Sequence, residues 1–239
     1  MNLEKSPLVE ALFEVAFKDE SKEYDPTLPG LFYSKIESDF PEKSEVSNFE
    51  YWVETKDGAR RKITAPLSRF SNSDGSIIQL TKDFIVFNKI APNINWLSLK
   101  DSILEKLEQF IQVNKNQNII SYSLKYFNII EIPTDEAMED NFTFSLSFPK
   151  NINYKLNGFL SKVHFETDGM MVRMNIESLE SESEDSNAIA LELIVTGNEE
   201  FAYNKEVLSE WLKEAHDLIC RVFIESLNVK LKEKYGDKN

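Results

Sequence analysis

Apolar and polar residues alternate at every second position over much of the chain, and the stretch Leu8–Lys18 is the clearest case. Successive side chains of a β-strand point to opposite faces, so a period of two predicts a strand with one apolar face. That face carries Val9, Ala11, Phe13, Val15 and Phe17, and the other face carries Glu10, Glu14 and Lys18. Pro7 precedes the run and does not interrupt it.

A meander of short strands is predicted next, because turn sequences divide the alternating segments. Asp57-Gly58 and Asp74-Gly75 are hairpin signals, since both residues of such a turn must accept a positive φ angle. Lys82-Asp83 predicts one more tight turn. The predicted strands are Phe49–Lys56, Arg60–Pro66, Leu67–Asn72, Ser76–Thr81 and Phe84–Lys89.

The second half of the chain repeats the alternation and contains a third hairpin signal, Asp168-Gly169. The strands predicted there are Ile120–Pro133, Phe142–Phe148, Phe159–Thr167, Met170–Ser178 and Ala188–Thr196. Before the last strand lies the acidic run Glu177–Asp185, which we expect to be a solvated hairpin loop. A docking surface for a basic partner, or a phosphorylation site, is the functional alternative.

Three segments show the apolar spacing of a helix. They are Leu31–Phe40, which Pro41 closes, then Trp96–Val113, and the long Lys205–Lys234 with Asn204 as its N-cap. Strands followed by helices, without strict alternation, predict an α+β fold of antiparallel sheet with segregated helices and a long C-terminal helix.

The chain divides naturally at about residue 118, because 1–118 and 119–239 each end with an amphipathic helix after antiparallel strands. This order hints at a duplicated strand-helix-meander-helix unit, with the two halves packed as one compact unit. Two arrangements stay open: paired curved sheets with helices on one face, or one strongly bent sheet around the terminal helix.

The net charge of −14, from 41 acidic and 27 basic residues, disfavours binding to nucleic acid or anionic lipid. A single cysteine, Cys220, excludes an internal disulfide and fits a reducing compartment. The chain has no signal-like start and no run of about 20 apolar residues. We therefore expect a cytoplasmic protein without membrane contact.

No catalytic motif stands out. The seven glycines form no nucleotide-binding cluster and no nucleophile elbow, and we expect no cofactor and no metal. Glu10 and Glu14 share a strand face, loosely resembling the charged interior of polyphosphate-processing enzymes, but Leu12 and Ala16 interrupt the pattern. The chain is therefore more readily explained as a non-enzymatic protein.

The two histidines are the remaining titratable candidates. His164 shares a predicted strand face with Lys162 and Glu166, which suits a surface position. His216 lies four residues before Cys220 on the last helix, a spacing that suits two metal ligands or an activated thiol. Since no third ligand is evident, an inert core cysteine explains the pair better.

Aromatic residues make up 12% of the chain, more than a plain core requires. We expect a Phe-rich core, with an apolar pocket between sheet and terminal helix as the functional alternative. A protein interface would look identical in sequence. The residues singled out for either role are Phe127, Phe144, Phe165, Met171 and Trp211.

The segment Pro7–Val15, PLVEALFEV, resembles the start of a family of uncharacterised proteins distributed sporadically among bacteria and archaea. Leu124–Ile130 and the helix with His216 also resemble segments of that family, although Lys125 and Phe127 depart from its pattern. The resemblance implies no activity. It marks Glu10, Glu14, Asn128 and His216 as the polar positions to watch.

Three functions remain after these exclusions. The first is a protein-interaction component that binds a protein partner or forms a homodimer, as an accessory of a prokaryotic defence or mobile-element system, such as antiphage defence. The second is a binder of a small apolar ligand in a cavity between sheet and helix. The third is an unrecognised hydrolase using clustered carboxylates such as Glu10 and Glu14, or His164.

Overall fold

A computed structural model describes residues 6–18, 25–54, 60–81, 83–92, 94–114, 118–145, 158–181, 183 and 185–236. The side chains of 47–54 and 60–65 lie outside this description. The predicted turn Asp57-Gly58, the residues 146–148 of one predicted strand, and part of the acidic run Glu177–Asp185 also lie outside the described residues.

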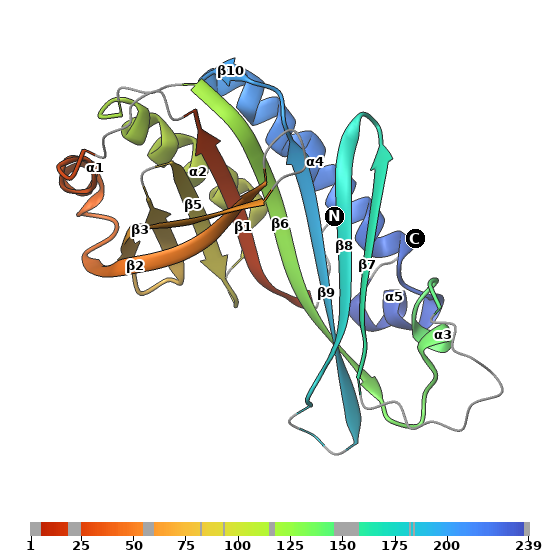
Figure 1. Cartoon of the computed structure of the whole chain (residues 1–239). Helices are drawn as coiled ribbons and strands as arrows, with labels where there is room; N and C mark the ends of the chain where they lie inside the picture. Colours follow the sequence, from red (N-terminus) through yellow and green to blue (C-terminus); the bar gives the residue numbers. More distant parts are fainter. Residues whose placement is uncertain are drawn as a thin grey trace. The chain divides into compact units, whose positions relative to one another are not determined.

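The protein has the α+β fold expected from its sequence, with one antiparallel sheet and helices separate from it (Figure 1). The strand order is β2-β3-β4-β5-β1-β6-β9-β8-β7, and β10 pairs with β6. The strands are β1 Leu8–Phe17, β2 Glu42–Glu54, β3 Arg60–Ser71, β4 Ser76–Leu80, β5 Phe84–Ile90, β6 Asn118–Pro133, β7 Leu160–Thr167, β8 Met170–Leu179, β9 Ser186–Gly197 and β10 Phe201–Ala202. The helices are α1 Leu28–Ile36, α2 Trp96–Ile111, α3 Met138–Asn141, α4 Lys205–Glu225 and α5 Val229–Tyr235.

The chain divides into two compact units. The α2 unit contains residues 10–124 and 196–213, and the β7–β8 unit contains residues 1–9, 125–195 and 214–239. Strands β1, β6 and β9 and helix α4 therefore contribute residues to both. The duplication of 1–118 in 119–239 stays a prediction about the chain's origin. No described helix combines the length and the apolar character that crossing a bilayer requires.

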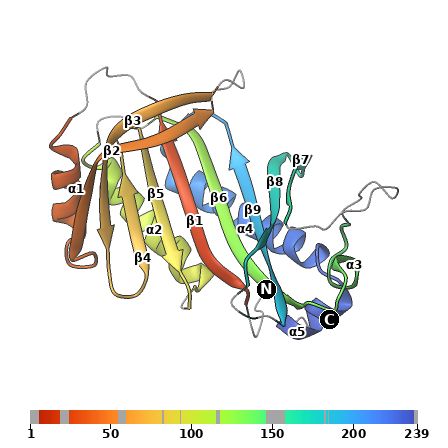
Figure 2. The same cartoon turned by 60° about the horizontal axis from the view of Figure 1, so that its bottom comes forward.

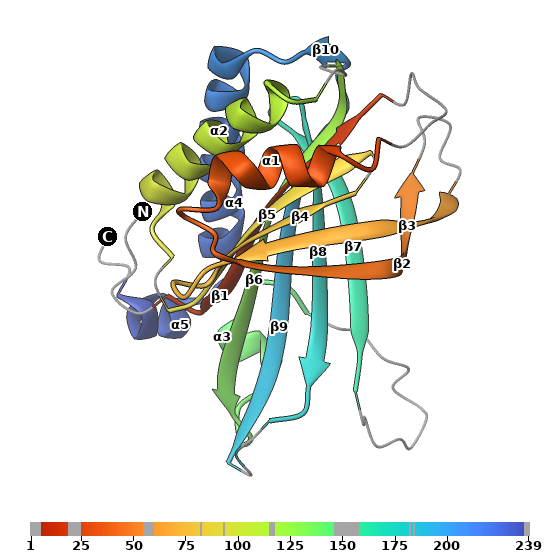
Figure 3. The same cartoon turned by 90° about the vertical axis from the view of Figure 1, so that its left-hand side faces the viewer.

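The core of the α2 unit is built on the apolar face of β1, as the period of two predicts. Ala11, Phe13 and Val15 have no exposed surface, and Glu14 on the opposite face is exposed. Helices α1 and α2 cover this core together (Figure 3), since Phe110 of α2 packs edge-on against Phe32 of α1.

The meander follows the predicted order, with corrected boundaries. The predicted helix Leu31–Phe40 is shifted toward the N-terminus: α1 runs from Leu28 to Ile36, because Pro29 occupies a first-turn position where proline is tolerated, and it ends before Phe40 and Pro41. The predicted separate strands Arg60–Pro66 and Leu67–Asn72 are the single strand β3, because Pro66 lies at a register irregularity opposite β2.

The core of the β7–β8 unit uses one face of β6, along which every second residue is buried. Tyr126, Asn128, Ile130 and Ile132 are all buried there. On the same unit, Asp168 and Gly169 both have positive φ angles, 53° and 72°, and join β7 to β8 in the predicted two-residue hairpin.

The prediction of one helix over Lys205–Lys234 is wrong at its C-terminal end. Helix α4 ends at Glu225 and α5 begins at Val229. Between them, the Asn228 side chain donates to the backbone carbonyls of Glu139 and Phe142, at 2.6 and 3.0 Å. These bonds hold the turn before α5, and a continuous helix would lose them. The N-terminal cap is confirmed, because the backbone N–H of Val207 donates to Asn204 Oδ1 at 3.0 Å.

The predicted strand Phe142–Phe148 is wrong over its described residues 142–145, where Phe142 forms only an isolated bridge with Leu227. Thr143 gives both of its donors to the end of α4, its backbone N–H to Ser226 O and its hydroxyl to Glu225 O. Over these four residues the alternation follows burial, with Phe142 buried and Thr143 exposed, and not strand pairing.

One buried charge fixes α2 to the turn after α1. Lys106 is 4% exposed, and its Nζ lies 2.5 Å from Asp39 Oδ2 and 2.8 Å from Glu105 Oε1. Burial lowers the pKa of Lys106, but the two carboxylates outweigh it and leave the pKa raised. The hydrogen bond and charge of Lys106 hold the pKa of Asp39 below its ordinary value.

We predict that Asp39→Asn lowers the free energy of unfolding by about 0.5–1 kcal/mol at pH 7, because the ammonium keeps only Glu105 as an anionic partner while solvent screens the half-exposed Asp39 carboxylate. Since the folded pKa of Asp39 is lowered, wild type should lose this stabilisation as pH falls below about 4, and the two proteins should converge there. Urea unfolding at pH 7 and pH 3 tests this. An equal difference at both pH values would contradict it.

Candidate functional site

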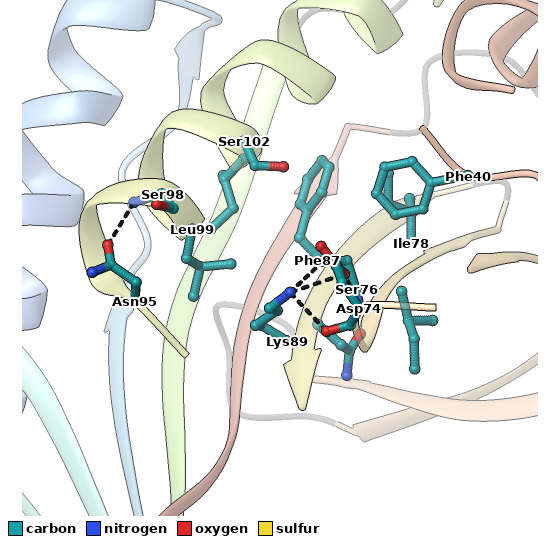
Figure 4. A pocket seen from close by; sticks show the side chains of 13 residues that line it. Phe40, Asp74, Ser76, Ile78, Phe87, Lys89, Asn95, Ser98, Leu99 and Ser102 are labelled. Carbon is teal, nitrogen blue, oxygen red and sulfur yellow. Dashed lines mark hydrogen bonds and ion pairs between the residues drawn. The ribbon is translucent and has the colours of Figure 1, made fainter. Parts of the chain in front are cut away.

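A pocket of about 300 Å³ lies in the α2 unit, between helix α2 and strands β4 and β5 (Figure 4). Its lining combines apolar and polar residues. The apolar ones are Phe40, Ile77, Ile78, Phe87, Leu99 and Ile103, and the polar ones are Asp74, Ser76, Asn88, Lys89, Asn95, Ser98 and Ser102. This size is at the lower end for small-molecule sites.

Strand register places the apolar floor. Ile78 of β4 lies opposite Phe87 of β5, which in turn lies opposite Phe13 of β1. The rings of Phe13 and Phe87 stack with their centroids 6.4 Å apart. Phe13 is completely buried, and its contact with the ring of Phe87 fixes the position of that ring, which lines the pocket.

A lysine and an aspartate form one polar edge of the pocket. Lys89 Nζ lies 2.9 Å from Asp74 Oδ1, 2.9 Å from the Asp74 carbonyl and 3.1 Å from Ser76 Oγ. Ser76 pairs with Lys89 across the strands, and Gly75, with φ 86°, allows the turn that brings Asp74 back. The ammonium therefore donates all three of its N–H groups to acceptors within the protein.

The same contacts set the charge of Asp74. Partial burial raises the pKa of this carboxyl, but hydrogen bonds from Lys89 and Ser76 outweigh it, and the pKa lies below its ordinary value. Asp74 is thus ionised at neutral pH and compensates Lys89. Since these are the two charged residues in the lining, the pocket is neutral overall.

Helix α2 supplies the opposite polar edge. Asn95 caps the helix by accepting the backbone N–H of Ser98 at 3.0 Å (Figure 4). Ser98 and Ser102 are one turn apart, so both hydroxyls lie on the pocket side. Neither hydroxyl has a hydrogen-bond partner among the described residues.

The carboxylates singled out from the sequence do not form a cluster. Glu10 is half-buried and accepts a hydrogen bond from Asn88 Nδ2 at 2.7 Å, and Glu14 is exposed. Both lie on the face of β1 opposite the buried Phe13. In the described residues, no group of three His, Cys, Asp or Glu could hold a metal ion.

Asn128 has a structural explanation. It is buried on β6, and its Nδ2 donates to the backbone carbonyl of Leu191 at 3.1 Å. This hydrogen bond satisfies the amide, as burial of a polar side chain requires.

His216 lies beside Tyr126 and Cys220 in the β7–β8 unit. The Tyr126 hydroxyl is 2.6 Å from His216 Nδ1, and Cys220 Sγ is 3.7 Å from the same ring. Burial lowers the pKa of His216 to about 4, and it raises the pKa of Cys220 to about 11 and that of Tyr126 far above its ordinary value. All three groups are neutral at pH 7, so the histidine does not activate the thiol.

His164 is exposed on β7, directly opposite Arg173 of β8. A polar row crosses the neighbouring strands: Asn175 Nδ2 donates to Glu192 Oε2 at 2.5 Å, and Lys125 Nζ lies 3.9 Å from Glu192 Oε1. His164 is thus a surface residue beside a cross-strand polar network.

The five apolar candidates do not enclose one cavity in the described residues. Phe165 pairs with Val172 and Met171 pairs with Glu166, so Phe165 and Met171 point to opposite faces of the hairpin. Met171 is 44% exposed, whereas Phe127, Phe144 and Phe165 are half-buried. Trp211 lies in the α2 unit, with its ring 4.6 Å from Tyr122 and 6.2 Å from Phe13.

The pocket residues are those that the sequence reasoning missed. Two signals were present: Ser98 and Ser102 sit beside the apolar stripe of a predicted helix, and Lys89 lies near the end of the apolar strand FIVFNKI. Neither signal is specific, because serines and a terminal lysine are ordinary on half-exposed elements. What makes them a site is the approach of α2 to β4 and β5.

Comparison with known proteins adds no assignment. No protein-family model and no curated protein matches the chain. Among solved structures, S. pombe Pct1 RNA triphosphatase in complex with the Spt5 CTD aligns over 94% of this chain and 84% of its own, at 11% identity and a TM-score of 0.13. A second structure of S. pombe Pct1 RNA triphosphatase covers 92% and 82%, at 9% identity and a TM-score of 0.14. Scores this low indicate neither a shared fold nor a function.

We predict that protonation of His216 destabilises the folded protein. Its folded pKa of about 4 lies below the ordinary value of 6.5, so the stabilisation is complete above about pH 6.5 and is lost as pH falls toward 4. His216→Gln should flatten this part of the stability profile. Urea unfolding of both proteins between pH 7 and pH 4.5 tests it, and parallel profiles would show that His216 does not titrate on unfolding.

Proposed function

We propose that this protein binds a small neutral amphiphile in the pocket between α2 and strands β4 and β5. The observation that carries the proposal is a pocket of about 300 Å³ with an apolar floor and polar edges on both sides. Such a combination is typical of small-molecule sites, in which apolar surface provides affinity and a few polar groups fix orientation.

The floor favours an apolar body in the ligand. Phe40 and Phe87 present ring surface, and Leu99 of α2 presents a branched aliphatic chain. Burying apolar ligand surface against them contributes roughly 25 cal/mol per Å² removed from water. A ring or a short branched chain matches this surface.

The edges favour a neutral polar head. The charge of Lys89 is compensated by Asp74, so an anionic ligand would have to compete with that carboxylate for the ammonium. The hydroxyls of Ser98 and Ser102 both donate and accept hydrogen bonds, which suits an alcohol, amide or carbonyl group.

The pocket can be tested by filling it. We expect purified protein to bind a neutral naphthylamine fluorophore at one saturable site, and Ser102→Tyr to weaken this binding at least tenfold by occupying the volume. Asp101→Tyr is the matched control, because Asp101 is exposed on the same helix turn and does not line the pocket. Fluorescence titration measures both, with thermal unfolding as a check of folding. Equal affinity of Ser102→Tyr and wild type would refute the proposal.

A second proposed function is protein interaction through the hairpin β7–β8, as an accessory component of a prokaryotic defence or mobile-element system. Large apolar side chains that face solvent on this hairpin support it: Leu160 is 55% exposed, Val163 40% and Met171 44%. The exposed charged residues Lys162 and Glu166 lie on the same hairpin, so it suits a partner that combines apolar contacts with charges of both signs.

This second function predicts a partner that depends on the hairpin. In affinity capture from the native host, Val163→Thr with Met171→Gln should lose any specific partner that wild type retains, while Val229→Thr should keep it. Val229 is 70% exposed and lies outside the hairpin, so it controls for a general loss of exposed apolar surface. Capture that is identical for all three proteins would count against the hairpin as the binding surface.

A further inference from the structure

Strand β7 ends the strand order of the sheet, with β8 as its one neighbour among the described residues (Figure 2). It is eight residues long and contains no proline. Natural edge strands are commonly blunted by proline, bulges, short length or charged side chains, because their backbone groups pair readily with another chain. Of these devices β7 has charged side chains, Lys162 and Glu166, which only a partner with matching charges can pair. The β7–β8 register runs from Leu160 to Thr167 without a shift.

The hairpin turn determines which backbone groups of β7 point away from β8. In a two-residue loop such as Asp168-Gly169, the flanking residues Thr167 and Met170 form a hydrogen-bonded pair, and such pairs then recur at every second position. The hydrogen bond from Ser178 N to Phe159 O agrees with this phase. The backbone N–H and C=O of Leu160, Lys162, His164 and Glu166 therefore point away from β8.

The side chains of β7 are complementary to a second, antiparallel copy of β7. If the two strands pair about His164, each His164 lies opposite the His164 of the other copy. Residues whose backbone N–H and C=O point away from β8 then lie opposite each other, so they can form hydrogen bonds between the copies. Lys162 then lies opposite Glu166 twice, and Val163 lies opposite Phe165 twice. Opposite charges and apolar pairs at facing positions each stabilise an antiparallel ladder by about 0.2–1 kcal/mol.

Other registers compatible with the backbone phase match the charges less well. Shifting the centre to Val163 sets Lys162 against His164 and Glu166 against Leu160. Shifting it to Phe165 sets Glu166 against His164 and moves Lys162 opposite Asp168 in the turn. The register about His164 is thus the one that pairs both Lys162 residues with Glu166 within the strands.

We propose that β7 pairs with β7 of a second copy of this chain across a two-fold axis at His164, which joins two sheets edge to edge. This inference rests on the second proposed function, because it names the partner. A two-fold contact uses the same patch on both copies, as a self-complementary strand requires. One strand pair buries little surface, so we expect a weak dimer with a dissociation constant of about 1–10 µM.

Charge reversal tests the register. Sedimentation velocity of wild type from about 1 to 200 µM, at physiological ionic strength, should show a reversible monomer–dimer equilibrium. Lys162→Glu and Glu166→Lys should each weaken it at least tenfold by setting like charges opposite each other, and the double variant should restore it. Within the hairpin these positions face Asn175 and Met171, so the swap creates no new charged pair there.

Two further variants separate pairing from general charge effects. His164→Pro removes an outward N–H without touching a hydrogen bond to β8, and should abolish the dimer. Lys213→Glu, exposed on α4, changes the net charge equally and should leave the dimer intact. Wild type that stays monomeric throughout, or a double variant no better than the single ones, would overturn the proposal. If wild type stays monomeric but still captures a foreign partner through the hairpin, this inference fails while the second proposed function stands.

Discussion

Burial of one face of β1 is the constraint on which the α2 unit depends. Phe13 and Val15 are completely enclosed, and the register of β1 against β5 places Phe87 opposite Phe13. A slip of one residue would turn Glu14 into the core and Phe13 outward, so the register is strongly specified. The position of β5 in turn decides where Lys89 meets Asp74, and hence where the polar edge of the pocket forms.

Most helices and strands could be predicted from the sequence because neighbouring residues determine them. Alternation identified β1 and β6, an Asp-Gly turn identified the β7–β8 hairpin, and Asn204 identified the start of α4. Errors arose where a distant residue decides the outcome. The C-terminal helix breaks because Asn228 bonds to the backbone near α3, and Phe142 is buried against the end of α4 instead of joining a strand.

The candidate site could not be predicted for the same reason. Its polar groups come from β4, β5 and α2, which are separated in sequence and lack a motif that links them. Conversely, residues that looked chemical in the sequence have structural explanations. Asn128 satisfies a backbone carbonyl, and His216 is desolvated beside Tyr126. A polar residue on an apolar element signals a required partner, and only the fold reveals whether that partner belongs to the protein or to a ligand.

The reactivity of the Cys220 thiol can report on local opening of helix α4. Its thiol pKa of about 11 leaves roughly one molecule in ten thousand as thiolate at pH 7, so a thiol-labelling reagent should react very slowly with the closed state. As it is the single cysteine of the chain and only partly buried, its labelling rate under native conditions, compared with the rate in urea, reports how strongly the folded α4 protects this position. The opening free energy of one helix is therefore accessible without introducing a probe.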